Sequence, residues 1–144
     1  MCLFCKIIAG DIPASKVYED DRLVAFNDIA PQAPMHVLVV PKAHVATLND
    51  LTAAHDGLVG EMTRRAAAIA ADRGYAASGY RTVFNCNADA GQAVFHIHLH
   101  VLGGQGGRQA VALGRILGED LAVRGEQAGA HDLGPAPEGG QDLL

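Results

Sequence analysis

The most constraining feature of this sequence is a short run, residues 94–102 (VFHIHLHVL), in which three histidines alternate with apolar residues. Side chains of a β-strand alternate between its two faces, so the run predicts a strand over residues 93–102 with one apolar face. Three imidazoles on the other face are costly to bury without partners, because each neutral ring carries a hydrogen-bond donor and an acceptor. The apolar face would hold Phe95, Ile97, Leu99 and Val101, and the other face His96, His98 and His100.

The histidine face allows three interpretations: structural histidines, a metal site, or nucleophilic and acid–base catalysis. Two alternate histidines of a strand can bind one zinc ion together with ligands from elsewhere, but three extend too far to share one ion. Neutral imidazole is a good nucleophile near neutral pH and titrates in the range where protons must move. Three purely structural histidines are the least favoured interpretation for a strand with a fully apolar reverse side.

The residues just before the histidines favour chemistry at a phosphate. Asn85 and Gln92 offer neutral amide donors, and Gly91 permits close approach of the backbone. Neutral donors and imidazoles together suit a phosphate or a phosphoryl group in transfer. Taken singly, Asn and Gln are weak indicators, because they often only stabilise turns.

Composition and charge argue against several other classes of protein. The 144 residues are 49% hydrophobic and 19% charged, which is typical of one globular domain. A net charge of −5 with scattered Lys and Arg argues against a nucleic-acid partner. Three cysteines argue against a secreted disulfide scaffold, and neither a signal peptide nor an apolar run of about 20 residues is present. We therefore expect a cytoplasmic protein that binds no membrane.

Hydrophobic periodicity and turn residues predict an α+β fold with an antiparallel sheet. The best helix covers residues 50–73, where apolar residues recur at helical spacing before Gly74. A shorter helix is predicted over residues 2–9, ended by Gly10. Besides the histidine run, strands are predicted at residues 16–19, 22–27, 35–40 and 80–86.

A change of character after Leu102 divides the chain. Residues 103–107 (GGQGG) form a break, and residues 127–144 are rich in Gly, Pro, Ala and acidic residues. We therefore expect a folded domain over residues 1–104. Residues 105–144 would form a C-terminal extension that is weakly helical at first and then disordered.

Several ordered motifs resemble the histidine-triad (HIT) family, and in particular its Hint-like branch of purine nucleoside phosphoramidases. The similarity runs from about Leu3 to Gly104 and centres on the motif His-x-His-x-His. It implies a HIT-like fold, an antiparallel five-stranded sheet with one long helix and a short N-terminal helix, and a homodimer. The matching segments are residues 11–14 (DIPA), 18–21 (YEDD), 25–29 (AFNDI), 31–34 (PQAP), 36–42 (HVLVVPK) and 100–104 (HVLGG).

The resemblance implies a catalytic role for three histidines. His98 would attack the α-phosphorus of a nucleotide and form a nucleotidyl-histidine intermediate that water then cleaves. His100 and His36 would contact the phosphate and complete the hydrogen-bond network around the nucleophile. The chain departs from the family pattern at Ala93, where Hint proteins have a Ser whose hydroxyl assists the leaving group, at Cys86-Asn87, and in the residues after Gly104.

The resemblance implies a nucleotide-binding set as well. The phosphate region would contact Asn85, Gly91 and Gln92, and the ribose hydroxyls would donate to Asp28. The residue types agree with these roles, because a flat apolar slot suits a purine and a carboxylate suits a diol. The apolar slot would be lined by Leu3, Phe4, Ile7, Phe26 and Ile29.

Cys2-x-x-Cys5 is a metal-type pair of cysteines, although one such pair alone is a weak indication. Some bacterial HIT proteins that this chain resembles combine such a pair with a histidine after the Pro-Lys strand end and one histidine of the triad. The resemblance thus implies a possible zinc site formed by Cys2, Cys5, His44 and His96. A closed set of four protein ligands is typical of a structural zinc, and it leaves His98 free.

These interpretations favour a hydrolase of purine nucleoside phosphoramidates, such as AMP linked to an amine, that requires no cofactor for catalysis. A second enzymatic interpretation is a dinucleoside polyphosphate hydrolase or nucleotidyl transferase of the same family. Two further classes stay open: a nucleotide-binding protein with weak catalysis, and a zinc-dependent binding module. Turnover, nucleotide binding and the effect of chelators would distinguish them.

Overall fold

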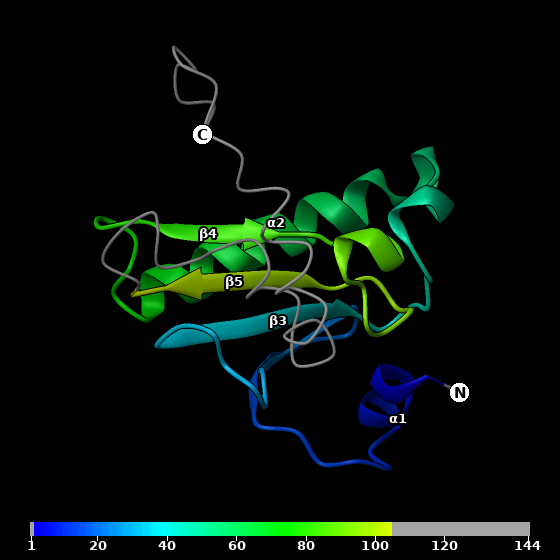
Figure 1. Cartoon of the computed structure of the whole chain (residues 1–144), viewed down its shortest axis with the longest axis horizontal. Helices are drawn as coiled ribbons and strands as arrows, with labels where there is room; N and C mark the ends of the chain where they lie inside the picture. Colours follow the sequence, from blue (N-terminus) through cyan, green and yellow to red (C-terminus); the bar gives the residue numbers. More distant parts are fainter. Residues whose placement is uncertain (1, 105–144) are drawn as a thin grey trace.

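The computed structural model describes residues 2–104, which form a five-stranded antiparallel sheet and two α-helices (Figure 1). The strand order β1-β2-β3-β5-β4 places β1 and β4 at the edges. The predicted α+β fold is thereby confirmed, whereas the predictions for residues 105–144 lie outside the described residues. The strands are β1 (Lys16–Glu19), β2 (Leu23–Asn27), β3 (Met35–Pro41), β4 (Tyr80–Val83) and β5 (Leu99–Gly103), and the helices are α1 (Leu3–Ala9) and α2 (Asp56–Asp72).

The two faces of the sheet are covered differently. Helix α2 runs along one face, behind the strands in Figure 1, and buries the main core against it. Side chains alternate along β3, so Val37 and Val39 enter this core while Leu38 and Val40 face α1. By the same alternation, His36 belongs to the face that α1 covers only in part, which places it where a ligand can approach.

The short helix α1 is defined by residues at both of its ends. Cys2 precedes it in an extended conformation, and its sulfur accepts a hydrogen bond from the Cys5 backbone N–H. Gly10 follows it at φ 85°, a left-handed conformation that favours glycine because it lacks Cβ. The buried side chains of α1 are Phe4 and Ile7, three positions apart and packed toward the sheet. The predicted helix over residues 2–9 is confirmed.

The long helix α2 begins at Asp56 and not at Asp50 as predicted. Asp50 instead closes a separate helical turn, because its carboxylate accepts hydrogen bonds from both the Thr47 backbone N–H (3.0 Å) and the Thr47 hydroxyl (2.9 Å). Leu51 follows in an extended conformation and still packs against the main core. No helix within residues 2–104 is long and apolar enough to cross a membrane.

The histidine run is less regular than the sequence predicts. Strand β5 begins at Leu99, where its pairing with β3 also starts, so His100 lies on the strand while His96 and His98 precede it. The Ile97 N–H donates to the carbonyl of Val45 at 2.7 Å, a residue of the loop after β3 and not of a strand. The prediction of a continuous strand from residue 93 is therefore wrong.

The predicted apolar face is correct only for its C-terminal part. Ile97, Leu99 and Val101 are buried in the main core, but the side chain of Phe95 is 47% exposed because the chain has already left the sheet there. Strand β4 likewise ends at Val83 and not at residue 86. Residues 84–98 therefore form a long connection that carries both His96 and His98 to the site.

Candidate functional site

A cavity of about 340 Å³ opens between α1, the loop after β2 and the histidines. This volume lies at the lower end of the range for small-molecule sites. Asn85 and Gln92 are not among its lining residues, and Ile29 stands at its rim with a side chain that is 99% exposed. The other predicted catalytic and nucleotide-binding residues all line it: Leu3, Phe4, Ile7, Phe26, Asp28, His36, Gly91, His98 and His100.

His98 is buried at the wall of this cavity with a defined ring orientation. Its Nδ1 lies 2.8 Å from the carbonyl oxygen of His96, and a carbonyl can only accept, so Nδ1 carries the proton. The lone pair of the neutral ring is therefore on Nε2. The edge of the Phe4 ring packs against His98 at a centroid distance of 4.9 Å and an interplanar angle of 87°. Burial lowers the pKa of His98, which keeps the ring neutral and nucleophilic at neutral pH.

A second pair of histidines is oriented by a backbone donor. The backbone N–H of Gln32 donates to His36 Nδ1 at 3.0 Å, so the proton of the neutral His36 ring lies on Nε2. That Nε2–H donates to Nδ1 of His100 at 2.9 Å, which leaves His100 with its own proton on Nε2. One backbone amide thus fixes the tautomers of both rings and supplies an N–H donor from His100 beside His98, whose ring centroid is 5.0 Å away.

Both rings of this pair stay neutral at neutral pH. Burial lowers the pKa of His100 to about 3, with further lowering by His98 and His36. Burial also lowers the pKa of His36, and the nearby carboxylate of Asp28 opposes this only in part. Asp28 Oδ2 lies 3.4 Å from His36 Nε2, while Oδ1 accepts a hydrogen bond from the Ala30 N–H at 2.9 Å. The carboxylate is therefore held in place at the cavity and retains capacity to accept from a ligand.

Gln92 has a different position from the one the sequence predicts for a phosphate ligand. Its side-chain amide N–H groups donate to the carbonyls of Ala46 (2.7 Å) and Val94 (3.1 Å), and its Oε1 accepts from the Asn87 N–H (2.8 Å). These bonds occupy the amide and hold the loop that leads to the histidines. Phosphate contact by Gln92 and Asn85 stays a prediction, whereas Gly91 lines the cavity directly.

Sequence analysis missed several residues of the cavity. Leu38 and Ser15 line it, as does Ile12 of the segment after α1. Leu38 could have been identified, because it lies two positions from His36 on the same face of a predicted strand. Ile12 and Ser15 precede the first strand in a turn-rich segment, where no periodic pattern indicates which way a side chain points.

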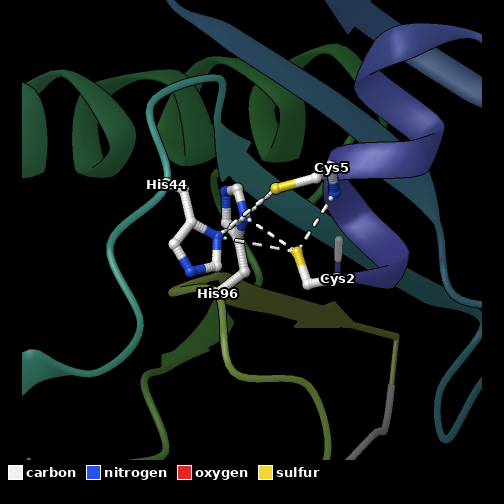
Figure 2. Close-up of side chains that lie close together, drawn as sticks. All are labelled: Cys2, Cys5, His44 and His96. Carbon is white, nitrogen blue, oxygen red and sulfur yellow. Dashed lines mark hydrogen bonds between the residues drawn. The ribbon is translucent and has the colours of Figure 1, made fainter.

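Two cysteines and two histidines converge next to this cavity, as Figure 2 shows. Cys2 and Cys5 come from α1, His44 from the loop after β3, and His96 from the connection before β5. The sulfur of Cys2 lies 3.6 Å from Nδ1 of His44 and 3.3 Å from Nδ1 of His96. The sulfur of Cys5 lies 3.3 and 3.5 Å from the same two nitrogens, which are 3.1 Å apart.

These spacings match the donor set of a tetrahedral zinc site. Zinc bonds of about 2.3 Å to sulfur and about 2.0–2.1 Å to nitrogen place sulfur and nitrogen ligands about 3.5 Å apart, and two nitrogens about 3.4 Å apart. The Nε2–H of His96 donates to the carbonyl of Pro41 at 2.7 Å, which leaves the lone pair on Nδ1, the nitrogen that faces the cysteines. The four predicted metal ligands are therefore brought together, and His96 has the tautomer that zinc binding through Nδ1 requires.

The chain matches the family model described as "Scavenger mRNA decapping enzyme C-term binding" over residues 1–111. It is 48% identical over 103 residues to a protein of Escherichia coli (strain K12) named purine nucleoside phosphoramidase, covering 72% of this chain and 87% of that relative. The match includes the part of the chain that forms the sheet and both helices.

Solved structures also resemble this chain in sequence and fold. A HIT family hydrolase from Legionella pneumophila is 51% identical with a TM-score of 0.71, covering 72% of this chain and 93% of that one. A zinc-bound histidine triad family protein from Mycobacterium smegmatis is 34% identical with a TM-score of 0.67, covering 88% and 96%. Fold and site together define a hydrolase built around histidines on one open face of an antiparallel sheet. The chain belongs to the histidine-triad family.

Proposed function

We propose that this hydrolase cleaves purine nucleoside phosphoramidates, with Nε2 of His98 as the nucleophile. The observation that carries the proposal is the bond from His98 Nδ1–H to the His96 carbonyl, because it leaves the Nε2 lone pair available in a cavity that also holds a carboxylate. The name of the Escherichia coli relative supports the substrate class.

The chemistry would proceed in two displacements at phosphorus. In the first, a bond forms between His98 Nε2 and the α-phosphorus while the P–N bond to the amine breaks. In the second, water attacks phosphorus, the bond to Nε2 breaks, and the nucleoside monophosphate leaves. The N–H of His100 would donate to a phosphoryl oxygen as charge develops there. Because Ala93 has no hydroxyl and is exposed at the cavity, the departing amine would take its proton from water.

The nucleotide would lie along the cavity from α1 to the histidines. Phe4, Ile7 and Phe26 provide buried apolar side chains for the purine, with the half-exposed Leu3 at the edge. The carboxylate of Asp28 would accept hydrogen bonds from the ribose hydroxyls, which places the α-phosphorus toward His98.

We further propose that Cys2, Cys5, His44 and His96 hold a structural zinc ion. The set offers four protein ligands, so no open coordination position is expected, and zinc would supply folding stability and not a reactive group. Support comes from the ligand spacings and from the zinc-bound relative of Mycobacterium smegmatis. A requirement for any other cofactor is not part of the proposal.

We propose a homodimer, in line with the family resemblance. Strand β4 is an edge of the sheet, and Tyr80, Arg81 and Thr82 along it are exposed. An exposed edge strand can pair with another chain. Light scattering on the purified protein would give the mass of a dimer if the proposal holds. A cytoplasmic location stays a prediction of the sequence.

The decisive experiment compares hydrolysis of adenosine 5′-phosphoramidate by the wild type and His98→Ala, each with and without chelator. We expect His98→Ala to lower kcat more than about a thousandfold. His55→Ala is the matched control, because that histidine caps a helical turn through Thr52 and does not line the cavity. Wild-type kcat should persist under chelator. Binding of AMP without any turnover would replace this proposal with a nucleotide-binding protein.

A further inference from the structure

Helix α1 contributes to both the metal cluster and the nucleotide cavity. Cys5, together with Cys2 at its N-terminal boundary, supplies the two sulfurs of the cluster. Phe4 and Ile7 on the same helix line the cavity where the purine would lie. A seven-residue helix moves as one body, so whatever fixes the two sulfurs also fixes this apolar wall.

Apart from the two sulfurs, the helix is attached to the sheet through one small apolar cluster. Phe4 and Ile7 are the buried residues of the helix, and Ile8 packs against the same cluster. An isolated helix of this length is not stable in water, because it is far shorter than the 12–15 residues that marginal stability requires. Its position therefore depends on tertiary contacts, which are the apolar packing of Phe4 and Ile7 and the metal cluster at its N-terminus.

Phe4 directly connects the metal cluster to the nucleotide cavity. Its ring packs edge-to-face against His98 at 4.9 Å, against Phe26 at 5.5 Å and against His96 at 6.0 Å between centroids. One neighbour is thus the proposed nucleophile, one is a wall of the purine slot and one is a proposed metal ligand. A shift of α1 would change all three contacts at once.

The position of His98 depends less on metal in the cluster than the position of the apolar slot does. Its Nδ1–H is bonded to the carbonyl of His96, and the His96 ring is anchored a second time by the Pro41 carbonyl. That second anchor does not involve a metal or a cysteine. Loss of metal should therefore loosen α1 more than it disturbs the nucleophile.

We propose that metal coordination by Cys2, Cys5, His44 and His96 positions the wall of the nucleotide slot, so that the metal and a purine nucleotide bind with positive cooperativity. This inference rests on the proposed nucleotide-binding function. The two cysteines are positioning residues, because they act through Phe4 and Ile7 and do not contact the nucleotide. Coupling between two sites is reciprocal, so nucleotide must strengthen metal binding by the same factor.

The test measures AMP binding by calorimetry to the full chain in its zinc-loaded and metal-free forms. We expect metal-free protein to bind AMP about tenfold more weakly, within the usual range of coupling between sites. Cys5→Ser should bind AMP as weakly as the metal-free wild type and should not respond to zinc. In a competition against a coloured chelator, saturating AMP should strengthen zinc binding by the same factor. In hydrolysis, removal of metal should raise KM and leave kcat nearly unchanged.

The control separates positioning from general stability. Leu58→Ala removes a buried side chain of α2 from the main core, to which no residue of α1 belongs, and should lower the melting temperature without changing the dissociation constant of AMP. Circular dichroism would verify that each form is folded at the measuring temperature. Equal AMP affinity with and without zinc would overturn the coupling and leave the proposed hydrolysis standing. Failure of zinc-loaded protein to bind AMP would overturn both.

Discussion

The metal cluster and the nucleotide cavity each take one histidine from the same connection, and they use opposite nitrogens of the ring. His96 donates from Nε2 to the carbonyl of Pro41 and presents Nδ1 to the cysteines. His98 donates from Nδ1 to the carbonyl of His96 and keeps its lone pair on Nε2. Two histidines separated by a single residue thus have their lone pairs on different nitrogens, because each ring donates to a different backbone carbonyl.

The neighbours of the two rings strengthen this division. His96 faces two thiols and His44, an environment that selects a soft metal ion. His98 faces an aromatic edge and the ring of His100, which is itself held neutral by burial. Residue type alone therefore does not distinguish a proposed metal ligand from a proposed nucleophile. The distinction comes from the ring nitrogen that donates to a backbone carbonyl, because the other nitrogen keeps the lone pair.

Comparing the variants His98→Ala and His96→Ala should separate hydrolysis from zinc binding most strongly. His98→Ala should lose more than about a thousandfold in kcat and retain its zinc, because the nucleophile is removed and the four ligands are intact. His96→Ala should lose zinc and keep most of kcat. Steady-state kinetics and elemental analysis on the same preparations check this. Zinc loss in His98→Ala, or a kcat equally low in both variants, would show that the two sites are not distinct.

Removal of zinc should have the next largest effect, on stability. A ligand that binds only the folded state stabilises it by about 4 kcal/mol when its free concentration is a thousandfold above its dissociation constant. Chelation should therefore lower the free energy of unfolding by several kcal/mol, measured by urea denaturation. His44→Ala should lower it similarly and should not respond to chelator. An unchanged unfolding midpoint under chelator would contradict a structural role for the cluster.

Acid should destabilise the fold through the cavity histidines. Burial lowers the pKa of His36, of His98 and of His100, the last to about 3, whereas each titrates near 6.5 in the unfolded chain. Below pH 6.5 the unfolded state binds more protons than the folded state, so stability falls as the pH falls. His100 alone should account for a loss of about 2 kcal/mol between pH 7.5 and pH 5.

Urea denaturation at these two pH values measures this loss. His100→Asn should lose about 2 kcal/mol less than the wild type over the same interval, because Asn does not titrate. Comparing the two proteins cancels protonation at the metal cluster, which both share. An identical loss in the variant would mean that His100 titrates normally in the folded state.

The smallest expected effect concerns stability and lies in the connection over residues 84–98, which contains His96 and His98. Asn87 has φ 66° and ψ −177°, a backbone conformation that is largely restricted to glycine. Gln92 holds this strained residue in place through hydrogen bonds to both its N–H and its carbonyl. Asn87→Gly should raise stability by about 1 kcal/mol, seen as a higher melting temperature. Asn87→Ala should lower it, and the opposite order would remove the argument from strain.

Sequence reasoning predicted the sheet, both helices and most of the residues that gather at the two sites. Hydrophobic periodicity indicated the helices and strands, because each buries apolar side chains at regular spacing. The resemblance to the histidine-triad family supplied the five-stranded sheet and most of the site residues. Sequence reasoning misplaced the start of α2, where Thr47 and Asp50 form a separate capped turn. It also extended β5 back to residue 93, since alternation continues through Ile97 although its N–H bonds a loop carbonyl.

The orientation of the site was beyond the sequence for a physical reason. Which nitrogen of a histidine carries the proton depends on a backbone group far along the chain, as with Pro41 for His96 and Gln32 for His36. Backbone groups have no sequence signature of their own. For the same reason, the sequence did not show that the side-chain amide of Gln92 donates to the backbone carbonyls of Ala46 and Val94.

The most direct test of the central claim is the tautomer of each ring in the resting protein. Long-range ¹H–¹⁵N correlation spectra of the zinc-loaded, ¹⁵N-labelled protein at neutral pH distinguish a protonated from an unprotonated ring nitrogen. We predict His98 with a protonated Nδ1 and a free Nε2, and His96 with a protonated Nε2. A protonated Nε2 on neutral His98 would contradict the account, because the proposed nucleophile would have no lone pair facing the phosphorus.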